Sequence, residues 1–142
     1  MEPARLDPTN PDHQHIAERL QSDLIVWFAT VRPDGRPHQV AVWFLWEGET
    51  ILIFSKPNQK VRNLRAQPAV SLGLDGTDIG DDVVTIEGVA ELLPDSVVTS
   101  ELPAYAAKYA ERLANMGWTA AHMAKSYTQA IRITPTKFTR IQ

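Results

Sequence analysis

Three apolar runs joined by two short turns constrain the fold of this chain more than any other feature. The segments 24–31, 37–46 and 50–55 have the length of strands and are rich in β-branched and aromatic residues, and RPDGR and EGE separate them. Proline and glycine stand in these connections where tight turns need them. Because connections this short join antiparallel neighbours, the sequence predicts an antiparallel meander.

Alternation of side chains identifies the faces of these strands and adds further strands. In 37–46, one face carries Val40, Val42, Phe44 and Trp46, and the other carries Gln39, Ala41, Trp43 and Leu45. In 83–93, the residues Val84, Ile86, Gly88, Ala90 and Leu92 face inward. Another strand is expected at 69–74, and one or two closing strands are expected around Pro135. The predicted fold is mainly β with short helices: six or seven antiparallel strands that close into a small barrel and so remove exposed edges.

Short helices are expected at three places, and a further helical turn or two is expected over 118–126. Asp12 is expected to cap the first, and Asn58 to cap a second over 59–67. Pro103 is expected to begin a third helix, which Gly117 ends. The third helix carries a stripe of Tyr105, Tyr109, Leu113 and Met116, which either packs on the barrel of its own chain or contributes to a contact between two chains.

Composition narrows the classes of protein that remain. The 142 residues are expected to form a single domain, 1–142, in which 1–11 is a loose N-terminal arm. The absence of cysteine excludes disulfides, a thiol nucleophile and cysteine metal sites. The polar N-terminus and the lack of a long apolar run predict a cytoplasmic protein without a membrane span, and the net charge of −3 argues against nucleic acid as a partner.

Positive charge gathers where the third strand meets the second helix. Between Thr50 and Leu74 there is no acidic residue, and the same window holds Lys56, Lys60, Arg62 and Arg65. Cations at the start of a helix face the positive end of its dipole, an unfavourable place for them unless an anion lies there too. A phosphate would use the free N–H groups and a lysine together, and Ser55 adds a hydroxyl donor.

Two other interpretations of these charges stay open. The basic residues could pair with the acidic loop 75–82 on a solvated surface, or they could form a small nucleic-acid patch, for which other basic and aromatic surface is lacking. The loop 75–82 itself is expected to be solvated, because its aspartates do not have the spacing of a calcium-binding loop. His13 and His15 point apart on a helix, so no metal site is expected.

The order of these segments is similar to a known family. HQVAVWFLW, TILIFS, QKVRNLRAQP and TIEGVAEL together resemble the FMN-binding split β-barrel proteins, the pyridoxamine 5'-phosphate oxidase-like superfamily, over roughly residues 15 to 95. The most specific portion is QKVRNLRAQP. Short members with a KVRNLR helix look most like the branch that uses the deazaflavin F420.

The resemblance implies where a cofactor would bind. Lys60 would hold its phosphate, with Ser55 and Gln59 beside it. The strand residues Gln39, Val40, Ala41, Val42 and Trp43 would lie under the isoalloxazine or deazaflavin ring. Lys56, Arg62 and Arg65 would form a basic rim suited to the polyglutamate tail of F420. Catalytic residues are not assigned, although His38 and Tyr127 are candidate proton donors with a structural role as the favoured interpretation.

The resemblance also implies an activity and an assembly. The expected function is F420-dependent transfer of a hydride between reduced cofactor and a small conjugated substrate. The alternatives are an FMN-binding oxidoreductase of the same fold and a non-catalytic protein that binds flavin or haem, with His38 or His122 as the haem ligand. The expected assembly is a homodimer with a shared site and Trp118 near the partner's cofactor. True pyridoxamine phosphate oxidase activity is not expected, because the chain lacks that enzyme's arginine- and tryptophan-bearing tail after its last strand.

Overall fold

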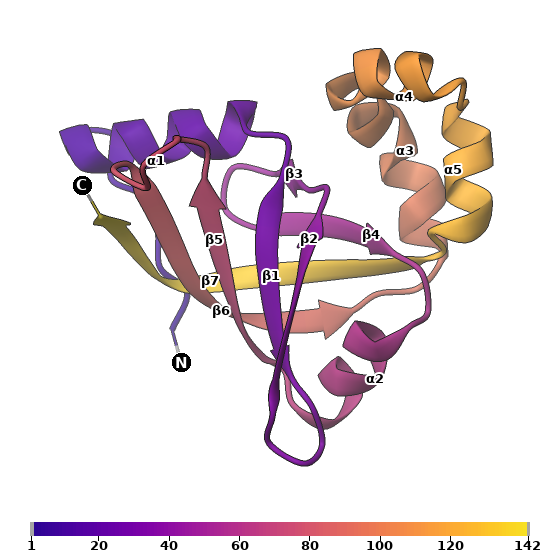
Figure 1. Ribbon diagram of the computed structural model, residues 1–142, viewed down its shortest axis with the longest axis horizontal. Coiled ribbons are helices and arrows are strands. Elements are labelled where there is room, and N and C mark those ends of the chain that lie inside the picture. The colour runs from indigo at the N-terminus through magenta and orange to yellow at the C-terminus, as the bar shows by residue number, and fades with distance from the viewer. Residues whose placement is uncertain (1, 142) are drawn as a thin grey trace.

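A curled antiparallel sheet forms the body of the protein (Figure 1). The computed structural model describes residues 2–141. The sheet is a seven-stranded half-barrel in the order β2-β1-β5-β6-β7-β4-β3. Its strands are β1 (Val26–Val31), β2 (Pro37–Val42), β3 (Leu45–Trp46), β4 (Ile51–Ser55), β5 (Ala69–Asp75), β6 (Val83–Leu92) and β7 (Gln129–Ile141). The predicted mainly-β class is therefore confirmed.

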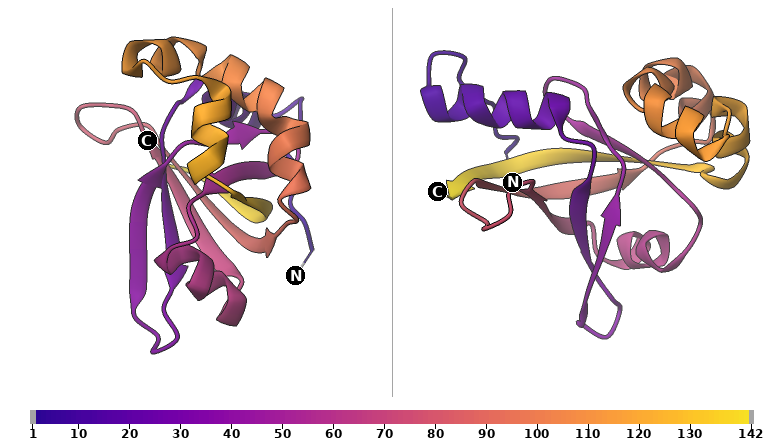
Figure 2. Two further views of the ribbon diagram at one scale, coloured as in Figure 1. Left: turned by 90° about the vertical axis from the view of Figure 1, so that its right-hand side faces the viewer. Right: turned by 45° about the horizontal axis from the view of Figure 1, so that its top comes forward.

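Five short helices surround this sheet in the described part of the chain. They are α1 (Pro11–Ser22), α2 (Gln59–Ala66), α3 (Ser96–Lys108), α4 (Ala110–Met116) and α5 (Ala120–Ser126). Figure 2 shows α3, α4 and α5 grouped together at one side of the sheet, apart from α1. None of the helices within 2–141 has both the length and the apolar character needed to cross a membrane.

Both predicted hairpins are present, but the strand between them is divided. β1 pairs with β2 from Val26 opposite Val42 to Val31 opposite Pro37, and β3 pairs with β4. The predicted continuous strand 37–46 is wrong, because the chain leaves the sheet at Trp43 and Phe44. β2 and β3 follow each other in sequence yet lie at opposite edges of the sheet. The sheet therefore keeps two edges where the sequence indicated full closure.

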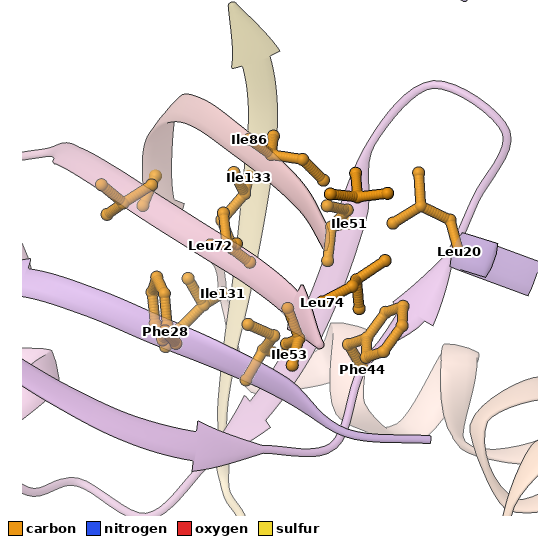
Figure 3. Packing of buried hydrophobic residues seen from close by; sticks show 14 of the residues in the cluster. Leu20, Phe28, Phe44, Ile51, Ile53, Leu72, Leu74, Ile86, Ile131 and Ile133 are labelled. Carbon is orange, nitrogen blue, oxygen red and sulfur yellow. The ribbon is translucent and has the colours of Figure 1, made fainter. Parts of the chain in front are cut away.

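Strand β4 shows how the apolar residues are shared between two cores. All five of its residues are buried. Ile51 and Ile53 belong to the cluster inside the curled sheet, which Figure 3 shows, and Leu52 and Phe54 belong to a second cluster under α3, α4 and α5. Because successive side chains point to opposite faces, one strand supplies both cores.

The helical layer differs from the prediction in where it begins. The prediction that Pro103 opens a helix is wrong, because α3 begins at Ser96 and Pro103 lies inside it. Val98 is buried on the same side as Tyr105, about two turns before it. Burying this stripe outweighs the loss of one hydrogen bond at proline. Gly117, with φ of 70°, ends α4 as predicted.

The predicted aromatic stripe packs on the sheet of its own chain. Tyr105, Tyr109 and Leu113 are buried in the second cluster, whereas Met116 is half exposed. Met116 differs from the other three because it is the last residue of α4, directly before Gly117, and the second cluster does not extend to it.

The first and second helices begin close to where they were predicted. Asn10, rather than Asp12, caps α1, since its Oδ1 accepts from the N–H groups of Asp12 (2.9 Å) and His13 (3.2 Å) and Pro11 occupies the first helical position. Asn58 stands at the cap position of α2, but its side chain does not cap the helix. Its Oδ1 accepts a hydrogen bond from Lys60 instead.

The N-terminal segment and the acidic loop both contact the rest of the fold. In the predicted loose arm, the N–H of Ala4 donates to the oxygen of Pro135 and Leu6 packs on the inner cluster, while Met1 lies outside the described residues. Asp82 of the loop is not simply solvated, since it lies 2.7 Å from His15 and 3.1 Å from Arg19. The ion pairs of this loop within 2–141 are those of Asp82 with α1 and with Arg140, so the interpretation that the loop pairs with the basic residues of α2 is wrong.

A β-bulge interrupts the pairing of the two longest strands, β6 and β7. β7 is one continuous strand, and its register with β6 shifts between Glu87 and Gly88, where Gly88 faces Pro135. A Cβ at Gly88 would lie 2.8 Å from Cγ2 of Ile133 and 2.9 Å from the oxygen of Thr134. The strands can approach this closely only because residue 88 has no side chain.

Gly88→Ala is therefore expected to lower the free energy of unfolding by about 1–3 kcal/mol through overpacking. Gly73→Ala is the matched control, because Gly73 also lies in a strand and a Cβ there meets nothing within 4 Å. Urea denaturation of both variants measures the difference. Equal stability of the two variants would contradict the close approach at the bulge.

Candidate functional site

A cavity of about 700 Å³ opens at the edge of the sheet formed by β2. Three parts of the chain enclose it: the strand β2 and the residues after it, the connection from β4 into α2, and the helical layer α3–α5. Its walls consist of Val40, Ala41, Val42, Trp43, Phe54, Lys56, Asn58, Lys60, Tyr105, Arg112, Asn115, Met116, Trp118, Met123 and Tyr127.

The strand wall is the free edge of β2. β2 pairs only with β1, so its outer N–H and C=O groups have no strand partner. Four consecutive residues, 40–43, line the cavity, which means that side chains of both faces and the backbone between them are accessible. Gln39, which was predicted to belong to this wall, is exposed and is not among the lining residues.

The lysine predicted to hold a phosphate lies in the cavity wall. Lys60 is 8% exposed, and its Nζ donates to Oδ1 of Asn58 at 3.2 Å. Burial, together with the positive charge of Lys56, lowers the pKa of Lys60 below the usual lysine value. The ammonium group is thus poorly solvated, and an anion beside it would stabilise the charged form.

Three of the predicted residues near Lys60 are directed elsewhere. Ser55 is fully buried, and its hydroxyl donates to the oxygen of Lys56 at 2.7 Å. Nε2 of Gln59 donates to Oδ1 of Asn63 at 2.7 Å, and Oε1 of Gln59 accepts from Arg62. Arg62 itself is exposed, and none of the three lines the cavity. Their polar groups are occupied within α2 and its connection.

Asn63 fixes α2 against the sheet, a role that sequence reasoning missed. Its side chain is fully buried, and its Nδ2 donates to the hydroxyl of Thr30 on β1 at 2.9 Å. The amide of Asn63 and the hydroxyl of Thr30 are both buried, so each requires a hydrogen-bond partner inside the protein. The signal in the sequence is the spacing of Asn63, which lies three residues after Lys60 and so on the same side of the helix. The structure shows that this side is buried.

The helical wall supplies most of the lining residues that sequence reasoning did not assign to the site. Arg112, Asn115 and Met116 come from α4, and Tyr127 follows α5. Nζ of Lys56 lies 5.4 Å from the centre of the Tyr127 ring, so this wall meets the connection into α2 directly. These residues carry little signal in the sequence, because only the folded chain brings them to β2.

Trp118 lies in the cavity of its own chain. Its ring is edge-on to His122, with 4.8 Å between the ring centres. The prediction that Trp118 lies near the cofactor of a partner stays a prediction; within its own chain, Trp118 lies in the cavity wall between α4 and α5. His122 is exposed and does not line the cavity.

The charge of the cavity wall is entirely positive among the described residues. Lys56, Lys60 and Arg112 line it, and no carboxylate does. Within 2–141, no group of three or more His, Asp or Glu side chains is arranged to hold a metal ion. The wall thus combines a strand edge, aromatic rings and three cations, an arrangement suited to a flat ligand with anionic groups.

The comparison with known families agrees with this arrangement. The family model of pyridoxamine 5'-phosphate oxidase matches residues 12–142. The chain belongs to this family. The resemblance predicted from the sequence motifs is therefore confirmed, and it extends beyond residue 95 through the helical layer and the last strand.

Solved structures of the same fold carry different names. A structure named as an F420 reductase is 30% identical, with a TM-score of 0.69, and the match covers 86% of this chain and 94% of that one. A conserved hypothetical protein, Rv2991 from Mycobacterium tuberculosis, is 25% identical over 100% and 90% of the two chains, with a TM-score of 0.72. The haem storage protein HutZ from Vibrio cholerae is 20% identical over 96% and 94%, with a TM-score of 0.66, and shows the fold alone.

Proposed function

We propose that this protein binds F420 in the cavity beside β2 and transfers a hydride between the reduced cofactor and a small conjugated organic substrate. The observation that carries the proposal is Lys60, a buried cation at the start of α2 in a cavity wall that contains no carboxylate among the described residues. The cofactor would supply the redox chemistry, and the protein would bind it, orient it and exclude water around its ring.

The start of α2 suits the phosphate of such a cofactor. The first N–H groups of a helix have no partner within the helix, and the helix dipole favours an anion there. Lys60 and Asn58 lie at this end and line the cavity. The hydrogen bond from Asn63 to Thr30 holds the helix in this orientation. Phosphate binding would therefore use backbone N–H groups and the ammonium of Lys60 together.

The edge of β2 suits the flat ring. Ala41 is small and exposed, so a ring can approach the backbone there. The outer N–H and C=O groups of β2 are free to bond the polar edge of a flavin or deazaflavin. Trp43 and Tyr127 supply aromatic surface in the same cavity. These are the groups that would orient the ring and exclude water from it.

Two observations favour F420 over FMN. The structure that shares 30% identity is named as an F420 reductase. In addition, Lys56 and Arg112 add two cations to the cavity wall beyond Lys60, which suits a ligand with anionic groups besides a single phosphate. FMN, whose only anionic group is its phosphate, would leave these charges without a partner.

A haem-binding function has less support from the cavity. Among the described residues, no histidine lines it. His38 lies on β2 outside the lining, and His122 is exposed beside Trp118. A flavin-binding protein without activity differs from the proposed enzyme only in turnover. Oxidation of reduced F420 by a panel of conjugated acceptors, followed by absorbance, tests the enzymatic part directly.

Lys60→Ala is expected to lower the affinity for F420 and for FMN roughly tenfold to a hundredfold, because it removes a charge-assisted hydrogen bond to phosphate. The fold should not be weakened, since burial already disfavours the charge of Lys60. Fluorescence titration measures affinity, and thermal unfolding measures stability. Lys125→Ala, an exposed lysine on α5, is the control. Unchanged titration curves for Lys60→Ala would exclude the phosphate site.

Lys56→Glu combined with Arg112→Glu is expected to weaken F420 binding by at least tenfold and to change FMN binding by less than about threefold. The reason is that only F420 carries a polyglutamate tail for these charges to attract, and like charges would repel it. The difference should shrink as salt is added, because exposed charges are screened over about 10 Å at 0.1 M. Equal losses for the two cofactors would place both residues at the shared phosphate instead.

We also propose that the working form is a homodimer, on the basis of the outer face of β1. Trp27 is 47% exposed, and its neighbours across the sheet are Ala41 and Gly73, which are too small to cover it. Residues directly opposite in a sheet share a face, so Trp27 stands beside the strand that lines the cavity. The same patch on a second chain would meet it across a two-fold axis.

Sedimentation is therefore expected to give about twice the 15.9 kDa of one chain. Trp27→Lys should produce monomers and weaken cofactor binding, because the covering chain is lost from beside Ala41. Ile79→Lys, which changes an exposed apolar residue in the loop after β5, is the control. A wild-type protein that sediments as a monomer and binds cofactor tightly would overturn the shared site.

A further inference from the structure

The break between β2 and β3 is held by two consecutive residues of the helical layer. At this break the N–H of Phe44 donates to the hydroxyl oxygen of Tyr109 at 2.8 Å, and the carbonyl oxygen of Phe44 accepts from Nζ of Lys108 at 2.8 Å. The hydroxyl of Tyr109 donates in turn to the oxygen of Leu24 at 2.6 Å. Both backbone groups of Phe44 thus find side-chain partners where the sheet offers none.

These contacts matter because Phe44 is fully buried. A chain that leaves a sheet inside a core carries unpaired N–H and C=O groups, and leaving them without partners is costly. Burial raises the pKa of Tyr109 well above its usual value, so the hydroxyl keeps the proton it donates. Nζ of Lys108 also lies 3.6 Å from the centre of the Phe44 ring, a cation–π contact on the same residue.

The same two residues reach the cavity through Trp43. The ring of Trp43 stacks on that of Tyr109 with 4.2 Å between centres and an angle of 3° between planes, and Trp43 lines the cavity. The backbone of Phe44 continues directly from the free edge of β2. A shift of the break would therefore move both the aromatic wall and the strand edge.

We propose that Lys108 and Tyr109 are positioning residues of the cavity, which hold Phe44 so that Trp43 and the edge of β2 keep the geometry that a bound ring requires. The identity of the ring as F420 or FMN rests on the proposed function. The contacts of Lys108 and Tyr109 with the backbone of Phe44, called the clamp below, do not rest on it. Neither residue lines the cavity, so each acts through Trp43 and β2.

The charge of Lys108 provides a way to separate positioning from stability. Burial lowers the pKa of Lys108 to about 8, and the negative charge of Asp23 opposes part of this shift. The other groups near the clamp are Tyr109, which stays protonated, and Arg112 on α4, whose charge acts on Tyr109. Near pH 8 the ammonium therefore begins to lose the charge that strengthens its bond to the oxygen of Phe44.

Stability and positioning should respond to this titration in opposite directions. Between about pH 8 and 10.5 the unfolded chain holds a proton on Lys108 that the folded chain has lost, so this residue's contribution to stability rises with pH. In the same window the clamp weakens. A purely structural lysine would show the first effect without the second.

The experiment compares Lys108→Met, Lys108→Arg and Tyr109→Phe with Lys125→Met, which changes an exposed lysine on the neighbouring helix α5. Lys108→Met and Tyr109→Phe are each expected to weaken F420 and FMN binding about tenfold, the effect of one hydrogen bond from a charged or buried donor. Lys108→Arg, which keeps a charged donor, should recover most of the affinity. Lys125→Met should bind like the wild type.

A second measurement needs no cofactor. In protein labelled with 5-fluorotryptophan, the fluorine resonance of Trp43, assigned with Trp43→Phe, should shift with a midpoint near pH 8 in the wild type and stay constant in Lys108→Met. In a separate titration with cofactor, the affinity of the wild type should fall relative to that of Lys108→Met across the same pH midpoint. This readout also serves if Lys108→Met folds poorly, because Lys108→Arg should abolish the shift as well.

The outcomes separate the two proposals. Two results together would overturn the positioning role: a folded Lys108→Met binds both cofactors like the wild type, and the Trp43 resonance of the wild type does not shift with pH. A wild-type protein that binds neither cofactor would overturn the proposed function, and the Trp43 resonance would still decide whether the clamp exists.

Discussion

The break at Trp43 and Phe44 is the constraint on which the rest of this structure depends. There the chain passes from one edge of the curled sheet to the other, so β2 and β3 are neighbours in sequence and opposite in the sheet. This route leaves the outer edge of β2 free and turns Trp43 into the cavity, while Phe44 enters the core. A continuous strand would have paired that edge, and the cavity would lack the wall that suits a flat ring.

The helical layer supplies the hydrogen-bond partners that stabilise this break, and it also forms the opposite wall of the cavity. Between β6 and β7, the helices α3, α4 and α5 cover the second cluster, in which Leu52 and Phe54 of β4 are buried. From the same layer, Lys108 and Tyr109 bind the backbone of Phe44, and Arg112 lines the cavity. The segment between β6 and β7 therefore covers a core, holds Phe44 and lines the cavity, which couples the stability of the break to the shape of the cavity.

Local pattern was enough to predict most strands, the two hairpins and the helix after Ser55, because alternation and turn chemistry are encoded within each segment. It failed at the break because alternation continues through Trp43 and Phe44 with no glycine or proline to interrupt it. Residues 40–43, Lys56 and Lys60 line the cavity, and their part in binding a cofactor stays a prediction. The lining residues of α4 and the bond of Asn63 to Thr30 depend on partners far away in sequence, which no local signal reports.

The cavity has a kinetic consequence, since its three walls come from segments that are far apart in the chain and meet only when β4 pairs with β7. Long-range pairing of this kind is slow to form, because the chain loses the entropy of loop closure before the stabilising contacts are made. A ligand that requires all three walls finds no site on a chain that is still folding. Occupancy would therefore lengthen the lifetime of the native protein by slowing unfolding and leave the rate of folding almost unchanged.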